Sequence, residues 1–225
     1  ISELGYHVQF HGQKSHYGVA LLSREKPVKV IKGFSHDDDA SQRRFIKCDF
    51  SLSGYRLRSV INSYCPQGEN RSHSIKFPGK QKFYADLQDF ISSEHKPEDL
   101  LIIMGDMNIA PVDNDIGIGE KNMKRWLKDG KTCFLPEERE WIQKLLDWGM
   151  VDTYRTHYPD VDNLFSWFDY RSRGFERDPK RGLRIDLILA STAASLHSTD
   201  AGIDYEIRAM DKPSDHCPIW SELAL

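Results

Sequence analysis

The 225-residue chain is long enough for one large domain with a substantial core, and its 39% hydrophobic and 29% charged residues exclude a collagen-like, coiled-coil or disordered protein. Its 31 Lys and Arg residues against 34 Asp and Glu residues give a formal net charge of −3, so any nucleic-acid partner must be argued from local basic surface. The longest apolar run, residues 100–104, is too short for a transmembrane helix, which needs about 20 residues.

The four cysteines are scattered, without CxxC spacing or a histidine in zinc-finger register: Cys48, Cys65, Cys133 and Cys217. They predict reduced thiols and a cytoplasmic protein. No linker and no repeat divides the sequence, so we expect one domain over residues 1–225. The chain begins at Ile1, without Met, in a stretch typical of the end of a helix, and we expect an N-terminal segment to be missing.

Strand-like runs dominate the first third of the chain. Residues 17–22 form an apolar run, and residues 45–52 and 55–64 flank Ser53-Gly54, a pair typical of a hairpin turn. These short runs predict β-strands, at least two of which are adjacent and antiparallel.

Two helices and three later strands are expected. Apolar side chains recur with helical spacing in residues 80–94, and Pro97 ends this pattern. In residues 136–148, Pro136 suits a first turn and Gly149 a C-terminal cap. Strands are predicted at residues 100–104, 183–190 and 219–225. The irregular alternation of strands and helices indicates a mixed α/β fold with largely antiparallel sheets.

The first candidate for chemistry is the turn Gly105-Asp106-Met107-Asn108, which follows the buried run of residues 100–104. Two positions apart in extended backbone, the side chains of Asp106 and Asn108 point the same way and offer oxygens to Mg²⁺ or to an attacking water. The alternative is a structural turn in which both side chains bind nearby backbone.

Two further candidates lie in the last fifth of the chain. Asp215 and His216 place an oxygen ligand beside a titratable base, although a solvated surface loop would contain the same pair. Asp186 lies within the apolar run of residues 183–190, where a carboxylate needs a cationic partner. That partner is a protonated histidine, a metal, or an arginine (Arg184 or Arg181) in a structural ion pair.

Aromatic and basic side chains alternate in two segments. Residues 167–184 contain four aromatic and six basic residues, and residues 121–131 contain five basic residues. Charge for phosphates and rings for bases or sugars are what nucleic-acid binding requires, whereas the alternative is a solvated face around a core tryptophan. Tyr64, before a Pro turn, either donates a hydrogen bond to a phosphate or packs in the core.

Together these residues resemble the exonuclease III family of bacterial abasic-site endonucleases, from about Leu4 to the C-terminus. The turn at residues 105–108 and Ser214-Asp215-His216 are shared with the wider DNase I-like superfamily, which includes inositol polyphosphate phosphatases and sphingomyelinases. More specific stretches indicate the nuclease branch: residues 64–69, 115–119, 134–141 and 165–172.

The resemblance implies an α/β fold of four layers, in which two packed mixed β-sheets are flanked by helices. It implies an exodeoxyribonuclease III that depends on Mg²⁺, with Mn²⁺ as a substitute. Such an enzyme cuts duplex DNA on the 5′ side of abasic sites and also has 3′-to-5′ exonuclease and 3′-end-trimming activities. The implied partner is double-stranded DNA with abasic sites or blocked 3′ ends, bound by a monomer without a membrane.

The resemblance also implies a role for each candidate residue. Asp106 would orient or deprotonate the attacking water, Tyr64 and Asn108 would contact the phosphate, and His216, oriented by Asp186, would stabilise the phosphate's developing charge. The implied metal ligands are Asp106, Asn108 and Asp215. The implied DNA contacts are Arg43, Arg44, Gln67, Lys121, Lys124, Arg125, Trp167, Phe168 and Arg171. An apolar pocket for a flipped-out abasic sugar is expected from Trp167, Phe168 and Leu189.

The chain departs from the family pattern at its start. Family members begin with a strand, a helix and a second strand that ends in a metal-binding Glu, and this sequence starts after these elements. We therefore expect an exposed sheet edge and weakened activity in the 225-residue chain. Two alternatives stay open: a superfamily phosphatase that acts on inositol phosphates or lipids, and an inactive DNA-binding fragment.

Overall fold

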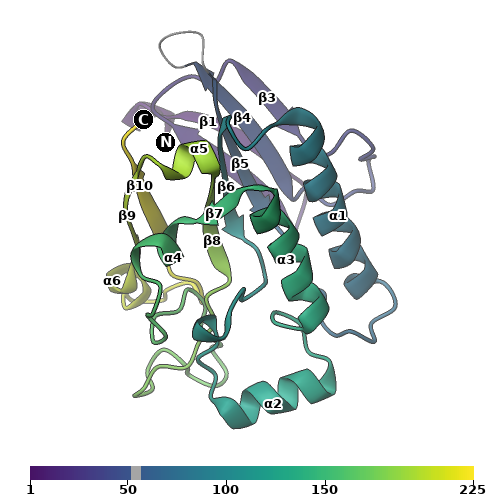
Figure 1. Cartoon of the computed structure of the whole chain (residues 1–225), viewed down its shortest axis with the longest axis vertical. Coiled ribbons are helices and arrows are strands. Elements are labelled where there is room, and N and C mark those ends of the chain that lie inside the picture. The colour runs from purple at the N-terminus through teal and green to yellow at the C-terminus, as the bar shows by residue number, and fades with distance from the viewer. Residues whose placement is uncertain (52–56) are drawn as a thin grey trace.

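The computed structural model describes residues 1–51 and 57–225, and its centre is a six-stranded mixed sheet (Figure 1). The strand order is β3 (Lys29–Lys32), β4 (Phe45–Ser51), β5 (Leu57–Tyr64), β6 (Leu100–Asp106), β8 (Asp186–Ser191) and β7 (Met150–Asp152). Only β5 and β6 are parallel among these pairs, and all other neighbours are antiparallel. A parallel pair needs a crossover connection, which α1 (Lys76–Glu94) supplies.

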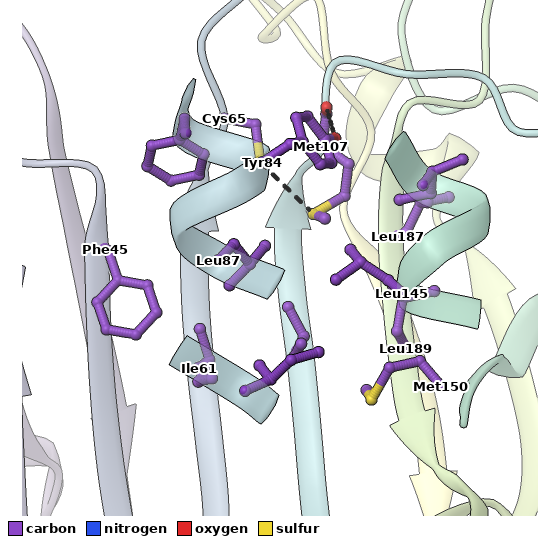
Figure 2. Packing of buried hydrophobic residues seen from close by; sticks show 14 of the residues in the cluster. Phe45, Ile61, Cys65, Tyr84, Leu87, Met107, Leu145, Met150, Leu187 and Leu189 are labelled. Atoms are coloured by element: carbon purple, nitrogen blue, oxygen red, sulfur yellow. Dashed lines mark hydrogen bonds between the residues drawn. The ribbon is translucent and has the colours of Figure 1, made fainter. Parts of the chain in front are cut away.

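One face of this sheet is covered by α1 and α3 (Pro136–Trp148), which pack side by side (Figure 1). Figure 2 shows the core between them and the sheet, where Leu87 and Leu145 approach Ile61, Leu187 and Leu189. The helical spacing in α1 selected five apolar residues, of which Phe90 is partly buried and the other four are buried: Phe83, Tyr84, Leu87 and Ile91. The prediction for α3 matches its observed bounds.

The opposite face of the sheet carries two separate two-stranded sheets. One pairs β1 (His7–Gly12) with β2 (Gly18–Ser23), and the other pairs β9 (Ser198–Ile203) with β10 (Ile219–Leu223). Val19 and Leu21 of β2 pack against Ile46, Cys48 and Phe50 of β4, and β10 contacts β8. Within the described residues, the second layer is therefore two short sheets rather than one continuous sheet.

The remaining elements are short helices that join the strands: η1 (Ser2–Leu4), η2 (Asp113–Asp115), α2 (Glu120–Asp129), α4 (Thr153–His157), α5 (Thr192–Ser195) and α6 (Tyr205–Arg208). No helix in the described part of the chain combines the length and hydrophobicity of a membrane span. The expected pairing of residues 45–52 with 55–64 is confirmed by β4 and β5, whereas the hairpin turn at Ser53-Gly54 lies outside the described residues.

One predicted strand begins later than expected. Residues 183–190 predicted a single strand, but β8 starts at Asp186. Leu183 instead forms isolated bridges with Ile116 and Trp167, and Ser166 Oγ accepts hydrogen bonds from the amides of Ile185 and Asp186, both at 3.0 Å. The segment before Asp186 is therefore tied to neighbouring loops, and the strand begins at the candidate site residue itself.

Candidate hydrolytic site

The strand register places three polar side chains in one row. Tyr64 is the last residue of β5 and pairs with Asp106, the last residue of β6. Asp106 in turn pairs with Asp186, the first residue of the antiparallel strand β8. Residues separated by 42 and 80 positions in the sequence thus meet at one edge of the central sheet.

The turn after β6 is closely packed against the turn after β5. Gly105 has φ of 131°, and a Cβ there would lie 2.1 Å from the carbonyl oxygen of Ser63, so only glycine fits. Asn108 donates from its backbone amide to Asp106 Oδ1 and from Nδ2 to Asp106 Oδ2, both at 2.9 Å. Nδ2 also donates to the carbonyl of Cys65 at 2.9 Å. The structural alternative is therefore confirmed, because both side chains bind within the turn or to nearby backbone, while the catalytic and metal-binding roles of Asp106 and Asn108 stay predictions.

The expected partner of Asp186 is present. Nδ1 of His216 donates to Asp186 Oδ1 at 3.0 Å and to Oδ2 at 2.8 Å. The arginine alternative is wrong for Arg184, whose guanidinium binds Asp115 and Asp152 in a separate buried network. The loop that carries His216 is fixed by an isolated bridge between Trp167 and His216. Asp186 thus orients an imidazole at the end of the sheet.

The electrostatics around Asp106 and His216 raise the pKa values of both groups. Burial raises the pKa of the Asp106 carboxyl to about 7, and the negative charge of Asp186 acts in the same direction. Burial lowers the pKa of His216, but its hydrogen bond to Asp186 and the surrounding carboxylates outweigh this and raise the pKa to about 9. At neutral pH the site therefore holds a protonated imidazole beside a carboxyl group near its titration midpoint.

Ligand atoms from Asp106, Asp186 and His216 lie within 4.8 Å of one another, a spacing that suits one metal ion. Both oxygens of Asp186, however, already accept from His216 Nδ1, which commits Asp186 to the imidazole. Asp215 is not in this cluster, and its Oδ2 accepts from the indole Nε1 of Trp167 at 3.0 Å. Of the two carboxylates among the predicted metal ligands, Asp106 belongs to this cluster and Asp215 does not.

Comparison with known proteins places these features in one family. Residues 2–216 match the Endonuclease/Exonuclease/phosphatase family. Exodeoxyribonuclease III of Haemophilus influenzae is 54% identical over 219 residues, which are 97% of this chain and 81% of that protein. The chain belongs to the exonuclease III family. It is therefore a DNA-repair nuclease that hydrolyses phosphodiester bonds.

Two solved structures extend the likeness to three dimensions. A 3′ phosphatase from Neisseria bound to a product DNA hairpin is 36% identical, with a TM-score of 0.86. The match covers 100% of this chain and 81% of the phosphatase chain. An AP endonuclease from Archaeoglobus fulgidus is 29% identical with the same coverage and a TM-score of 0.87. The mixed α/β fold is thus that of DNase I-like exonuclease III relatives.

Among the DNA contacts that the exonuclease III resemblance implied, Arg44 is not at the surface. It is 6% exposed, and its guanidinium lies 4.1 Å from the ring centre of Tyr17 and 4.5 Å from that of Tyr64. It also donates to the Tyr64 carbonyl at 2.9 Å. Arg44 thus holds Tyr64 and lines the same cavity as Tyr64 and Gln67, and its contact with a phosphate stays a prediction.

Two other implied contacts are held by neighbouring groups but stay near the surface. Arg43 donates to the carbonyls of Asp38 and Asp39. The side chain of Gln67 donates to Thr132 Oγ1 at 2.9 Å and accepts from the amide of Glu69. Both roles stay predictions.

The two basic segments come together in the structure. α2, which presents Lys121, Lys124 and Arg125 to solvent, lies apart from the sheets at one end of the molecule (Figure 1). A cavity of about 150 Å³ joins it to Trp167, and three arginines line this cavity: Arg125, Arg177 and Arg181. Arg177 and Arg181 were not among the expected contacts, although their basic and aromatic segment was. Arg171 is exposed on the same loop.

The expected three-residue apolar pocket is wrong. Phe168 and Leu189 are both fully buried, and they belong to different core clusters. Of the three residues, Trp167 alone remains partly exposed beside the site. The sequence could not show which of Trp167 and Phe168 is buried, because two adjacent aromatic residues in a loop have no periodic pattern that distinguishes a buried face from an exposed one.

A buried ion pair behind the site was also missed. Lys80 and Glu138 are both 0% exposed, and Lys80 Nζ lies 2.5 Å from Glu138 Oε1. The signal was available in part, because Lys80 lies four residues before Tyr84 and therefore on the apolar face of α1. A lysine on that face requires a buried acidic partner.

Proposed function

We propose that this exonuclease III family member cuts duplex DNA on the 5′ side of abasic sites by hydrolysis at the row of Tyr64, Asp106 and Asp186. The observation that carries the proposal is the hydrogen-bonded Asp186–His216 pair, which lies in register with Asp106 at the end of the central sheet. Phosphodiester hydrolysis needs a positioned water and positive charge near the phosphate, and this row supplies groups for both.

Each residue has a distinct task in the proposed reaction. Asp106 orients the attacking water, and its raised pKa of about 7 lets the carboxylate accept a proton near neutral pH. His216, protonated below its pKa of about 9, stabilises negative charge on the phosphate oxygens. Tyr64 directs a phenol toward the phosphate. Asn108, whose Nδ2 donates to Asp106 and to the carbonyl of Cys65, holds the Asp106 carboxylate and keeps its Oδ1 for a cation.

The donor set fits a hard divalent cation, and we propose Mg²⁺, with Mn²⁺ as a substitute. Buried Asp106 carries an unfavourable negative charge near Asp186, which a cation would offset. Carboxylate and amide oxygens are the ligands that Mg²⁺ prefers, so Asp106, Asn108 and Asp215 would hold it. When bound, Mg²⁺ supplies Lewis-acid stabilisation of the phosphate's charge.

We also propose 3′-to-5′ exonuclease and 3′-end-trimming activities on duplex DNA, and the four-layered sandwich as the family's complete fold. The Neisseria relative is described as a 3′ phosphatase bound to product DNA, which supports the first part. The TM-scores of 0.86 and 0.87 to two solved relatives support the four-layered fold. The arginine-lined cavity beside Trp167 suits DNA phosphates better than a small soluble substrate.

The proposal is tested by incubating the 225-residue chain with a duplex that contains one synthetic abasic site, in Mg²⁺ and in EDTA. We expect a single cut on the 5′ side of the lesion in Mg²⁺ and none in EDTA. Inositol polyphosphates serve as the competing substrate class. Phosphate release from them without DNA incision, by folded protein, would replace the nuclease proposal with that of a phosphatase.

Trp167→Ala is expected to reduce the preference for abasic over intact duplex by about tenfold, because the partly exposed indole lines the cavity beside the site and offers an apolar face to an abasic sugar. Incision rates on the two duplexes give the ratio. Trp167→Phe is the matched control, since it keeps an aromatic face and loses only the hydrogen bond to Asp215. An unchanged ratio in Trp167→Ala would exclude the indole from lesion recognition.

A further inference from the structure

A buried ion pair lies directly behind the proposed hydrolytic site. Lys80 on α1 and Glu138 on α3 are each 0% exposed, and their charged atoms are 2.5 Å apart. Removing two charges from water is unfavourable, and apolar residues of similar volume often stabilise a core as well or better. Stability alone therefore does not account for this pair.

Lys80 makes two further hydrogen bonds that connect the active-site turns. Its Nζ donates to the carbonyl of Asn108 at 2.8 Å and to that of Gln67 at 3.3 Å. Asn108 lies in the turn after β6, and Gln67 lies in the turn after β5. The side chain also passes Gly68 so closely that an added Cβ would lie 3.0 Å from Lys80 Cδ. One ammonium group thus joins the turn behind Tyr64 to the turn behind Asp106.

Tyr84 binds the neighbouring carbonyl of the same turn. Its hydroxyl donates to the carbonyl of Met107 at 2.5 Å, as Figure 2 shows, and it lies one helical turn after Lys80. α1 therefore holds the consecutive carbonyls of Met107 and Asn108. These bonds stabilise Asn108 at its φ of 52°, a left-handed conformation that Asn adopts more readily than most other non-glycine residues but still at a cost.

Glu138 anchors the other end of this arrangement. Its Oε2 accepts from the amides of Cys133 and Leu135 at 2.8 and 2.9 Å, while Oε1 accepts from Lys80. The carbonyl of Cys133 in turn accepts from the amide of Ala110 at 2.7 Å. Both ends of the turn at residues 107–110 are therefore tied to the ion pair.

We propose that Lys80, held by Glu138, is a positioning residue for the hydrolysis, because it fixes Asp106 and Asn108 relative to Tyr64. The inference rests on the proposed function, in which these three side chains contact the phosphate, the attacking water or the cation. Lys80 is fully buried and acts only through the turns that it joins. A misplacement of about 1 Å in such a site lowers the rate by about a hundredfold.

The test compares kcat and KM for incision of the abasic duplex by folded variants. Lys80→Met keeps the unbranched shape of the side chain, one atom shorter, but removes its three donors, and we expect kcat to fall about ten- to hundredfold while KM changes little. Tyr84→Phe removes one hydroxyl, and we expect a smaller loss in kcat. Lys144→Met, on the exposed side of α3, is the matched control and should change neither constant.

A second variant separates positioning from stability. Lys80→Met/Glu138→Gln removes both buried charges, so we expect its melting temperature to recover relative to Lys80→Met while kcat stays low. Recovery of kcat together with stability would overturn the proposal, and so would a parental kcat in Lys80→Met. Where Lys80→Met does not fold, parental kcat in both Tyr84→Phe and the double variant would overturn it in the same way.

Hydrogen exchange provides a readout that does not depend on turnover. The amides of Asn108 and Ala110 should exchange faster in Lys80→Met, while that of Ile103 within β6 should be unchanged. Unchanged exchange at Asn108 and Ala110 would contradict the positioning role. An inactive parental chain in which Lys80→Met still accelerates this exchange would reject the proposed function and leave the role of Lys80 in the turn intact.

Discussion

Replacement of Asp186 by Asn is expected to lower kcat for incision by up to about 10⁴-fold, the loss found where an Asp that orients a catalytic histidine is neutralised. The loss follows from the geometry, because both Asp186 oxygens accept from His216 Nδ1 and their charge stabilises the imidazolium. The affinity for uncut duplex should change far less, since the Asp186 side chain is only 12% exposed and faces His216.

The pH profile gives a second signature of the same variant. His216 is protonated below its pKa of about 9, so activity that needs the imidazolium is lost as pH rises through that value. Without the charge of Asp186 the imidazolium loses its main support, and the alkaline limb of the Asp186→Asn profile should move to lower pH. Asp89→Asn, the same substitution at an exposed position of α1, is the control. Incision near the parental rate would show that the Asp186–His216 pair is not used in the reaction.

Replacement of Asp106 by Asn is expected to have opposite effects on activity and on stability. Activity should fall by at least about 10³-fold, because the group that orients the water loses its charge. Stability at pH 8 in EDTA should rise by about 1 to 4 kcal/mol, because the variant has no buried carboxylate to ionise at that pH. Asn keeps one acceptor for the amide of Asn108 but loses the oxygen that accepts from Asn108 Nδ2, so the expected rise is the net of a relieved buried charge and one lost hydrogen bond.

The sign of this stability change follows from the pKa. Burial raises the pKa of Asp106 in the folded chain to about 7, above its ordinary value of 3.8. Between these two pH values the Asp106 carboxyl binds a proton in the folded chain but not in the unfolded chain. Its contribution to the stability of the parent chain is therefore fully present below about pH 4 and is lost as pH rises through about 7. Melting temperatures of parent and variant between pH 4 and pH 8 measure it. A variant that melts lower than the parent at pH 8, where Asp89→Asn is neutral, would contradict the assigned burial.

The features of the site that are local in sequence could be predicted from the sequence. The apolar run of residues 100–104 followed by a polar turn places Asp106 and Asn108 at the end of a buried strand, and β6 confirms this. Asp186 needed a cationic partner because it lies in an apolar run. That this partner is His216, 30 residues later, came from the resemblance to exonuclease III, since sequence spacing does not specify pairings between distant segments.

Predictions failed where tertiary packing decides which way a side chain faces. Phe168 was assigned to the DNA surface from the resemblance, but it is buried in an aromatic cluster. Lys80 was overlooked for the converse reason, because a single lysine on an amphipathic helix normally reaches solvent. Only the position of Glu138 on a neighbouring helix makes its burial possible.

Cutting an abasic duplex in H₂¹⁸O tests most directly the central claim that a water positioned by Asp106 attacks the phosphorus. Mass spectrometry of the two product strands locates the label. The account predicts one ¹⁸O atom in the new 5′-phosphate, an unlabelled 3′-hydroxyl on the other strand end, and no product in EDTA. An unlabelled 5′-phosphate, or an unsaturated sugar at the 3′ end, would contradict it, because the strand would then have been cut by elimination at the sugar instead of hydrolysis at phosphorus.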